Sequence, residues 1–129
     1  MKVLNFEDSV YKANAICKVL NQCGVAKIEL VSNVEDGLQM LKNAEDAGAP
    51  FDLIITDMHY PMKQGAVSDT EAGEKLVQLL QEHGKQTKVI VCSSRNMKLP
   101  GVYGCIWYSE ISDWEEELCD LVREMEKNR

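Results

Sequence analysis

Residues 51–61, FDLIITDMHYP, contain the most informative strand of this sequence. Leu53, Ile54 and Ile55 form a short apolar run of branched residues, which is typical of a strand buried on both faces inside a parallel sheet. Asp57 follows where that strand meets its loop, and Pro61 favours an extended conformation for the residue before it. Ligands of open α/β sheets bind beyond the carboxyl ends of the strands, so Asp57 is a candidate for chemistry. The alternative is an acid that only forms a turn.

The rest of the chain alternates between short apolar runs and amphipathic segments. Helices begin at residues with capping side chains: Ser9, then Asn33 or Ser32, then Asp69 or Thr70, and last Ser112, which forms a capping box with Glu115. Residues 96–103 contain Pro100-Gly101 and leave room for little more than one helical turn. The predicted strands are residues 2–6, 27–31, 53–55, 88–92 and 105–108, and the predicted helices run over about 10–23, 34–45, 70–83 and 112–125.

Strands that alternate with helices predict a parallel sheet covered on both faces. We expect one α/β domain over residues 1–129, a doubly wound (βα)5 flavodoxin-like fold with strand order 2-1-3-4-5 and a shortened fourth helix. Its switch point lies between the first and third strands. This topology brings Glu7, Asp8 and Asp57 into one crevice, with Ser93 at the end of the next strand.

Composition limits the classes of function. The net charge of −7 argues against direct binding to nucleic acid, and no apolar run is long enough to cross a membrane. We therefore expect a cytoplasmic protein. The five cysteines include no C-x-x-C pair, so buried reduced thiols are favoured over a disulfide framework or a zinc site. The two histidines, His59 and His83, are too few and too scattered for a histidine metal site.

Three carboxylates in one crevice repel one another. Two such charges about 4 Å apart cost roughly 4 kcal/mol at an effective dielectric near 20. Either one carboxyl is protonated or a cation lies between them. An acid-rich, all-oxygen site suits Mg²⁺, and a carboxylate beside Mg²⁺ at a strand end can attack a phosphoryl group to form an acyl phosphate. The Ser93 hydroxyl would hold one phosphoryl oxygen, unless it only caps the segment that follows.

These residues resemble the receiver domain of bacterial two-component response regulators. The resemblance covers the whole chain and rests on the pair Glu7-Asp8, on Asp57 with Pro61 four residues later, and on Ser93. It implies that Asp57 accepts a phosphoryl group from a histidine kinase or phosphotransfer protein. It also implies that Glu7, Asp8, Asp57 and the backbone carbonyl of His59 bind Mg²⁺, and that Ser93 closes onto the phosphoryl group.

The sequence departs from the receiver pattern in three places. The lysine that ends the fifth strand in the family is replaced by Tyr108, and the switch aromatic is replaced by Cys105. The fourth helix is largely lost. The loop from Met58 to Thr70 is long, so that Gly73 and Leu76 of the family's Pro-x-x-x-Gly-x-x-Leu motif come late, and we expect this loop to be mobile. Positive charge near Asp57 would then come from Mg²⁺, Arg95 or Lys63.

Three functions remain open. The first is a stand-alone receiver that is phosphorylated on Asp57 and acts on an unknown downstream protein. The alternative is a pseudo-receiver, an interaction module that works without phosphorylation. A phosphatase or phosphotransferase is disfavoured because the segment Asp57-Met58-His59 lacks a second acid to serve as general acid. Trp107 and Tyr108 are either core aromatics or part of a contact face.

Overall fold

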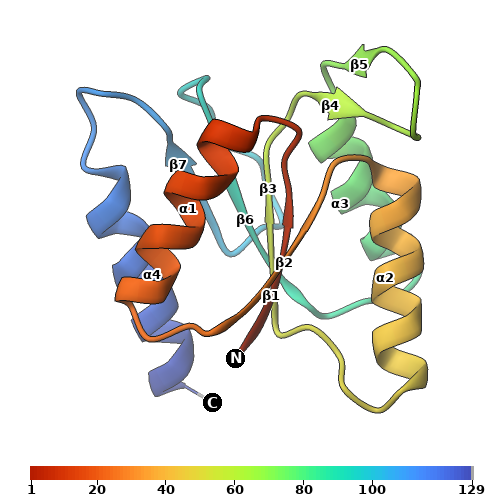
Figure 1. The fold of residues 1–129 in the computed structure, drawn as a ribbon, viewed down its shortest axis with the longest axis horizontal. Helices are drawn as coiled ribbons and strands as arrows, with labels where there is room; N and C mark the ends of the chain where they lie inside the picture. Colours follow the sequence, from red (N-terminus) through yellow and green to blue (C-terminus); the bar gives the residue numbers. More distant parts are fainter. Residues whose placement is uncertain (129) are drawn as a thin grey trace.

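The computed structural model describes residues 1–128, which form one parallel five-stranded sheet with helices on both faces (Figure 1). The strand order is β2-β1-β3-β6-β7, which confirms the predicted order 2-1-3-4-5. The strands are β1 Lys2–Phe6, β2 Lys27–Val31, β3 Leu53–Thr56, β6 Lys88–Ser93 and β7 Gly104–Trp107.

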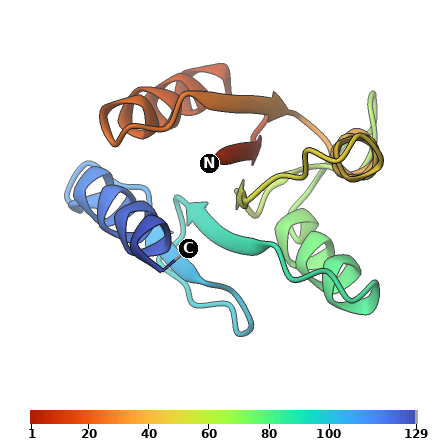
Figure 2. The same cartoon turned by 90° about the horizontal axis from the view of Figure 1, so that it is seen from below.

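Helices cover both faces of the sheet (Figure 2). Helices α1 (Val10–Gln22) and α4 (Trp114–Lys127) pack on one face, and α2 (Val34–Asp46) and α3 (Ala72–Glu82) pack on the other. Successive residues of β3 point to opposite faces: Ile54 belongs to the core under α2 and α3, and Ile55 to the core under α1 and α4. The apolar run is therefore buried on both sides, as predicted.

Two of the predicted helix caps are confirmed. The Ser9 hydroxyl accepts the Lys12 amide at 3.3 Å, and the Asn33 side chain accepts the Asp36 amide at 2.8 Å. The capping box at Ser112 is wrong, because α4 begins after Asp113 and has no side-chain cap. The Ser112 hydroxyl instead donates to the Trp107 carbonyl at 2.6 Å and ties the loop to the end of β7.

The fourth helix is reduced further than expected. Residues 94–103, between β6 and β7, contain turns and irregular backbone but no helix. Pro100 starts a turn in which Gly101 has φ of 82°, a conformation that favours glycine. The Leu99 amide donates to the Cys105 sulfur at 3.3 Å, and the Trp107 indole donates to the Ser94 carbonyl at 3.0 Å. These contacts hold the loop along β7 in place of a helix.

The long loop after Asp57 carries a small antiparallel ribbon. Strand β4 (Tyr60–Pro61) pairs with β5 (Ser68–Asp69), so the extended conformation expected before Pro61 is confirmed. Tyr60 is fully buried, and its hydroxyl lies 2.8 Å from the Thr56 hydroxyl. The loop that we expected to be mobile is therefore anchored in the core at Tyr60.

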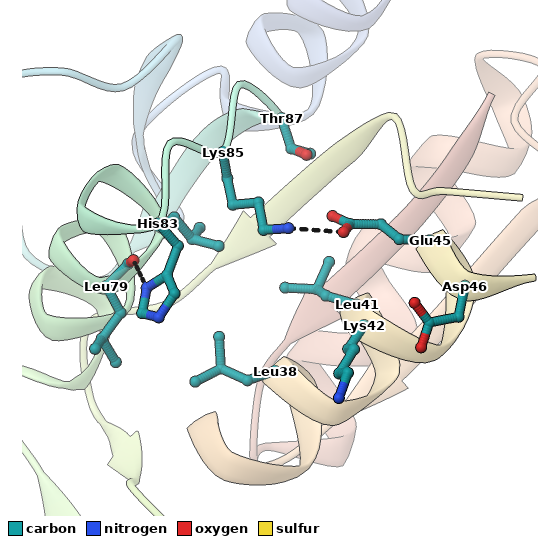
Figure 3. A pocket seen from close by; sticks show the side chains of 10 residues that line it. Leu38, Leu41, Lys42, Glu45, Asp46, Leu79, His83, Lys85 and Thr87 are labelled. Atoms are coloured by element: carbon teal, nitrogen blue, oxygen red, sulfur yellow. Dashed lines mark hydrogen bonds and ion pairs between the residues drawn. The ribbon is translucent and has the colours of Figure 1, made fainter. Parts of the chain in front are cut away.

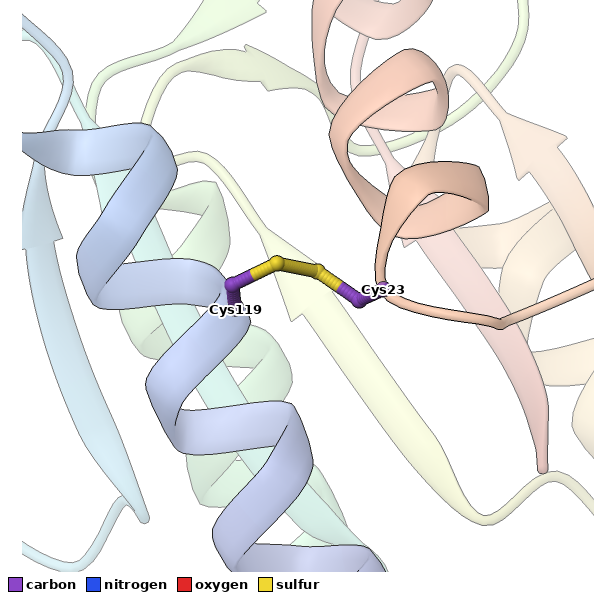
Figure 4. Close-up of a disulfide and its surroundings, with 2 residues drawn as sticks. All are labelled: Cys23 and Cys119. Atoms are coloured by element: carbon purple, nitrogen blue, oxygen red, sulfur yellow. A yellow bond between two sulfur atoms is a disulfide. The ribbon is translucent and has the colours of Figure 1, made fainter.

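The expectation of reduced cysteines is wrong for one pair. Cys23, at the end of α1, forms a disulfide with Cys119 of α4 (Figure 4). Cys17, Cys92 and Cys105 are free thiols. The two bonded residues are 96 positions apart in the sequence, so no local spacing pattern could reveal the pair.

No helix in residues 1–128 combines the length and the apolar character needed to cross a membrane.

Candidate functional site

Asp57 stands at the carboxyl end of β3, where its side chain opens into a pocket of about 680 Å³. Its backbone amide donates to the Phe6 carbonyl at 3.1 Å, which fixes the residue against the end of β1. The Met58 amide donates to Oδ1 of the Asp57 carboxylate at 2.7 Å. The side chain is 15% exposed, so one part of the carboxylate is held and another part faces the pocket.

Lys12 of α1 reaches into this pocket and supplies its positive charge. Its Nζ lies 2.9 Å from Oε1 of Glu7 and 3.3 Å from Oδ1 of Asp57, and it donates to the Cys92 carbonyl at 2.7 Å. Lys12 is only 7% exposed. The cation expected between the carboxylates is therefore a side chain of the protein, and it comes from neither Arg95 nor Lys63.

The pKa values show how strongly these groups interact. Burial alone would lower the pKa of Lys12, but the carboxylates of Asp57 and Glu7 outweigh burial and raise it above its usual value. Burial also raises the pKa of Glu7, against the opposing effect of the Lys12 ammonium. The Lys12 side chain is therefore held in its charged form.

Sequence reasoning missed Lys12, although the helical pattern contains the clue. Lys12 precedes Ile16 by four residues and Val19 by seven, so it lies on the buried face of α1. A lysine on an apolar helix face needs a partner carboxylate at the end of its side chain. Glu7 and Asp57 were the candidates already identified at the adjacent strand ends.

The three acids predicted for the pocket do not have equal roles. All three line it, but Glu7 is 2% exposed and both its oxygens are engaged, Oε1 with Lys12 and Oε2 with the Ser9 amide at 3.1 Å. Asp8 is exposed, and Asp57 is half-buried. Of these three acids, Asp8 and Asp57 therefore remain accessible to a ligand, and the exposed carboxylates of Glu110 and Glu115 also line the pocket.

The residues present fit Mg²⁺ with a smaller ligand set than expected. Within residues 1–128, no three acidic, histidine or cysteine side chains gather closely enough to hold a metal ion. Mg²⁺ is usually bound through one or two carboxylates and keeps several waters. Asp8 and Asp57 supply that number, whereas Glu7 is occupied by Lys12 and does not fit as a direct ligand. The backbone carbonyl of His59 stays a predicted ligand, and the His59 side chain is exposed.

The hydroxyl at the end of β6 lies differently from the expectation. Ser93 is 2% exposed, and its hydroxyl accepts the Arg95 amide at 3.1 Å. Ser94, the next residue, is exposed and lines the pocket with Asp57. The Arg95 guanidinium donates to the Thr70 carbonyl at 3.3 Å and ties this loop to the segment before α3.

The two atypical positions of β7 have different surroundings. Tyr108 lines the pocket, and its ring lies 5.2 Å from the Lys12 Nζ and 4.8 Å from the Trp114 ring. Cys105 is not part of the pocket lining, and its sulfur contacts the backbone of Leu99. Tyr108 is therefore part of the candidate site, whereas Cys105 holds the loop that replaces the fourth helix.

A second hollow, of about 420 Å³, lies between α2 and α3 (Figure 3). Leucine side chains form its floor, and an ion pair of 2.7 Å between Lys85 and Glu45 lies at its rim. Lys85 and Thr87 precede β6, so this hollow is at the amino ends of the strands, opposite Asp57. The Asp57 pocket is the better candidate, because it lies at the carboxyl ends of the strands, where ligands of open α/β sheets bind.

Comparison with known proteins supports the fold at low sequence identity. No protein-family model matches the sequence, and no curated protein sequence matches it either. Among solved structures, the Francisella response regulator 1452 receiver domain is similar with a TM-score of 0.73 and 17% identity, over 99% of this chain and 98% of that one. The signal receiver domain of an HD domain-containing protein from Pseudomonas fluorescens Pf-5 has a TM-score of 0.72 and 15% identity, over 98% and 94%.

A chemotaxis response regulator gives the same result. CheY4 of Vibrio cholerae is similar with a TM-score of 0.66 and 20% identity, over 96% of this chain and 97% of that one. The similarity spans nearly all of both chains in each case. The chain has the fold of a response-regulator receiver domain.

Proposed function

We propose that this protein is a signalling receiver that accepts a phosphoryl group on Asp57. The observation that carries the proposal is the Asp57 carboxylate, which ends the central strand, opens into a pocket and lies 3.3 Å from a buried ammonium. Lys12 and the Met58 amide engage Oδ1. Within residues 1–128, Oδ2 makes no hydrogen bond or ion pair, so it is the oxygen we assign to the attack on phosphorus.

The reaction is a single transfer between two named groups. An oxygen of Asp57 attacks the phosphorus of a phosphohistidine on a histidine kinase or phosphotransfer protein. The new P–O bond forms as the P–N bond breaks, and the imidazole keeps the electron pair and takes up a proton. Asp8 and Asp57 would hold Mg²⁺, which supplies positive charge to the phosphoryl oxygens. The protein is thus a phosphoacceptor that passes its state to a downstream protein.

A phosphorylation-independent interaction module is the second candidate. It is favoured by Cys105, whose sulfur is tied to the backbone of Leu99 where receivers carry a switch aromatic. A side chain of this size cannot rearrange as an aromatic ring does. This candidate predicts the same fold, but no dependence on Asp57 chemistry.

Intact mass separates the two candidates. The protein is incubated with Mg²⁺ and phosphoramidate, which delivers a phosphoryl group without a kinase. We expect one added phosphoryl group on the parent protein and none on Asp57→Asn, and the adduct should be lost at alkaline pH, as acyl phosphates are. An unmodified parent protein, with the fold intact by circular dichroism, would support the interaction module instead.

A further inference from the structure

We infer that Lys12, on α1, is the fixed charge that holds the phosphoryl group on Asp57. This inference rests on the proposed function and adds to it a residue outside the receiver pattern. The end of β7, where that pattern has a lysine, is occupied by Tyr108. Lys12 reaches the pocket from the helix instead, and the Tyr108 ring lies beside its ammonium.

Groups at the ends of three strands fix the position of the Lys12 ammonium. Its Nζ contacts Glu7 after β1, Asp57 after β3 and the carbonyl of Cys92 in β6. An ammonium has three N–H donors, and here it has one hydrogen bond, to the Cys92 carbonyl, and ion pairs with two carboxylates. The side chain is 7% exposed, and its contacts hold the ammonium in one position. It is therefore a preorganised charge.

The charge balance shows why such a cation is needed. Among the described residues, five acids line the pocket, Glu7, Asp8, Asp57, Glu110 and Glu115, and Lys12 is the one basic residue in the lining. A phosphoryl group adds about −1.5 to −2 at neutral pH. The Arg95 guanidinium is bound to the Thr70 carbonyl, and Lys63 is exposed on the long loop. Among the described residues, Lys12 alone places a cationic side chain within 4 Å of the Asp57 carboxylate.

Phosphorylation frees one donor of Lys12. As an acyl phosphate, Asp57 no longer carries a carboxylate charge, and the negative charge moves outward to the phosphoryl oxygens. The N–H that pairs with Oδ1 then has a stronger acceptor within reach. The contacts with Glu7 and with the Cys92 carbonyl keep the Lys12 Nζ in place during this change.

A merely structural role for Lys12 makes a different prediction. In that reading the ammonium only neutralises the buried Glu7 carboxylate, and Asp57 does not need it. The double variant Glu7→Gln plus Lys12→Met would then be phosphorylated at the same rate as the single variant Glu7→Gln. This pair of variants is a matched test, because neither leaves an unpaired charge at position 7.

The experiment measures the initial rate of phosphorylation by phosphoramidate in Mg²⁺, with Glu7→Gln as the reference. We expect Glu7→Gln plus Lys12→Met to be slower by about tenfold or more, because an ammonium near the phosphoryl group is lost. Adding Tyr108→Lys should restore part of the rate by bringing a cation from β7. Lys18→Met, which removes an exposed lysine of the same helix, controls for net charge.

A second measurement does not depend on phosphoryl transfer. Beryllium trifluoride binds carboxylates as a phosphoryl mimic, and its effect on melting temperature reports binding. We expect a rise for Glu7→Gln and a smaller rise once Lys12→Met is added. Equal rates and equal shifts in the two variants would overturn the role of Lys12 while leaving the proposed function standing. If neither the parent nor the reference accepts a phosphoryl group, both the proposed function and this inference fail.

Discussion

The buried Lys12 ammonium lies between the carboxylates of Glu7 and Asp57. At this depth an unpaired charge would lower the free energy of unfolding. Removing one partner of such a buried pair typically costs about 3–5 kcal/mol, because the remaining charge is left without compensation. The raised pKa of Lys12 shows that attraction to Asp57 and Glu7 exceeds its own burial cost. Glu7, Lys12 and Asp57 therefore form one charge network, and Asp8 is an exposed acid beside it.

The difference between Asp8 and Glu7 predicts different responses to Mg²⁺. Asp8→Asn should leave the metal-free melting temperature unchanged or slightly raised, since an exposed acid next to other acids is lost. The rise in melting temperature on adding Mg²⁺ should disappear in this variant. Glu7→Gln should retain that rise, because Lys12 already occupies the Glu7 carboxylate. Loss of the Mg²⁺ effect in both variants would show that Glu7 is a direct ligand.

Gly73 lets α3 approach the end of β3. A Cβ at this position would overlap the carbonyl oxygen of Asp57 and lie 3.0 Å from the Cα of Met58. Backbone atoms cannot yield as a flexible side chain can. We expect Gly73→Ala to lower the free energy of unfolding by about 1–3 kcal/mol, measured by urea denaturation. Glu74→Ala, at the exposed neighbouring position, is the control, and equal stability of the two variants would contradict the tight contact.

At the scale of elements, the disulfide joins the two helices of one face. It closes a segment of 96 residues between α1 and α4, and closing a long segment lowers the entropy of the unfolded chain. Reduction, or Cys23→Ser, should therefore lower the free energy of unfolding by about 2–4 kcal/mol. Cys17→Ser on the same helix is the control. Identical denaturation curves with and without reductant would show that the bond does not form.

Elements with local sequence patterns could be predicted, and elements held by distant contacts could not. The strands and the caps at Ser9 and Asn33 follow from periodicity and side chains next to the helix start. The Ser112 capping box failed because the Trp107 carbonyl, five residues earlier, takes the hydroxyl instead. The β4–β5 ribbon has only two residues in each strand, too few for alternation to show.

At the scale of the whole molecule, topology explains which part of the site was foreseeable. Parallel strands end at one edge of the sheet, so Glu7, Asp8 and Asp57 could be brought together from their positions after strands. Lys12 enters the pocket from the packing of α1 across the ends of β1, β3 and β6, which depends on the angle of the helix. The sequence pattern shows that Lys12 lies on the buried face of α1, but it does not show the helix angle that brings the ammonium to Asp57.

Lys12 and Asp57 form a charge pair at this edge of the sheet. A double-mutant cycle of Lys12→Met and Asp57→Asn, with the free energy of unfolding measured by urea denaturation, tests it most directly. We expect the two changes to be non-additive by about 1–3 kcal/mol, because each removes the same interaction. Additivity within about 0.5 kcal/mol would show that the two side chains do not interact, and would contradict the account.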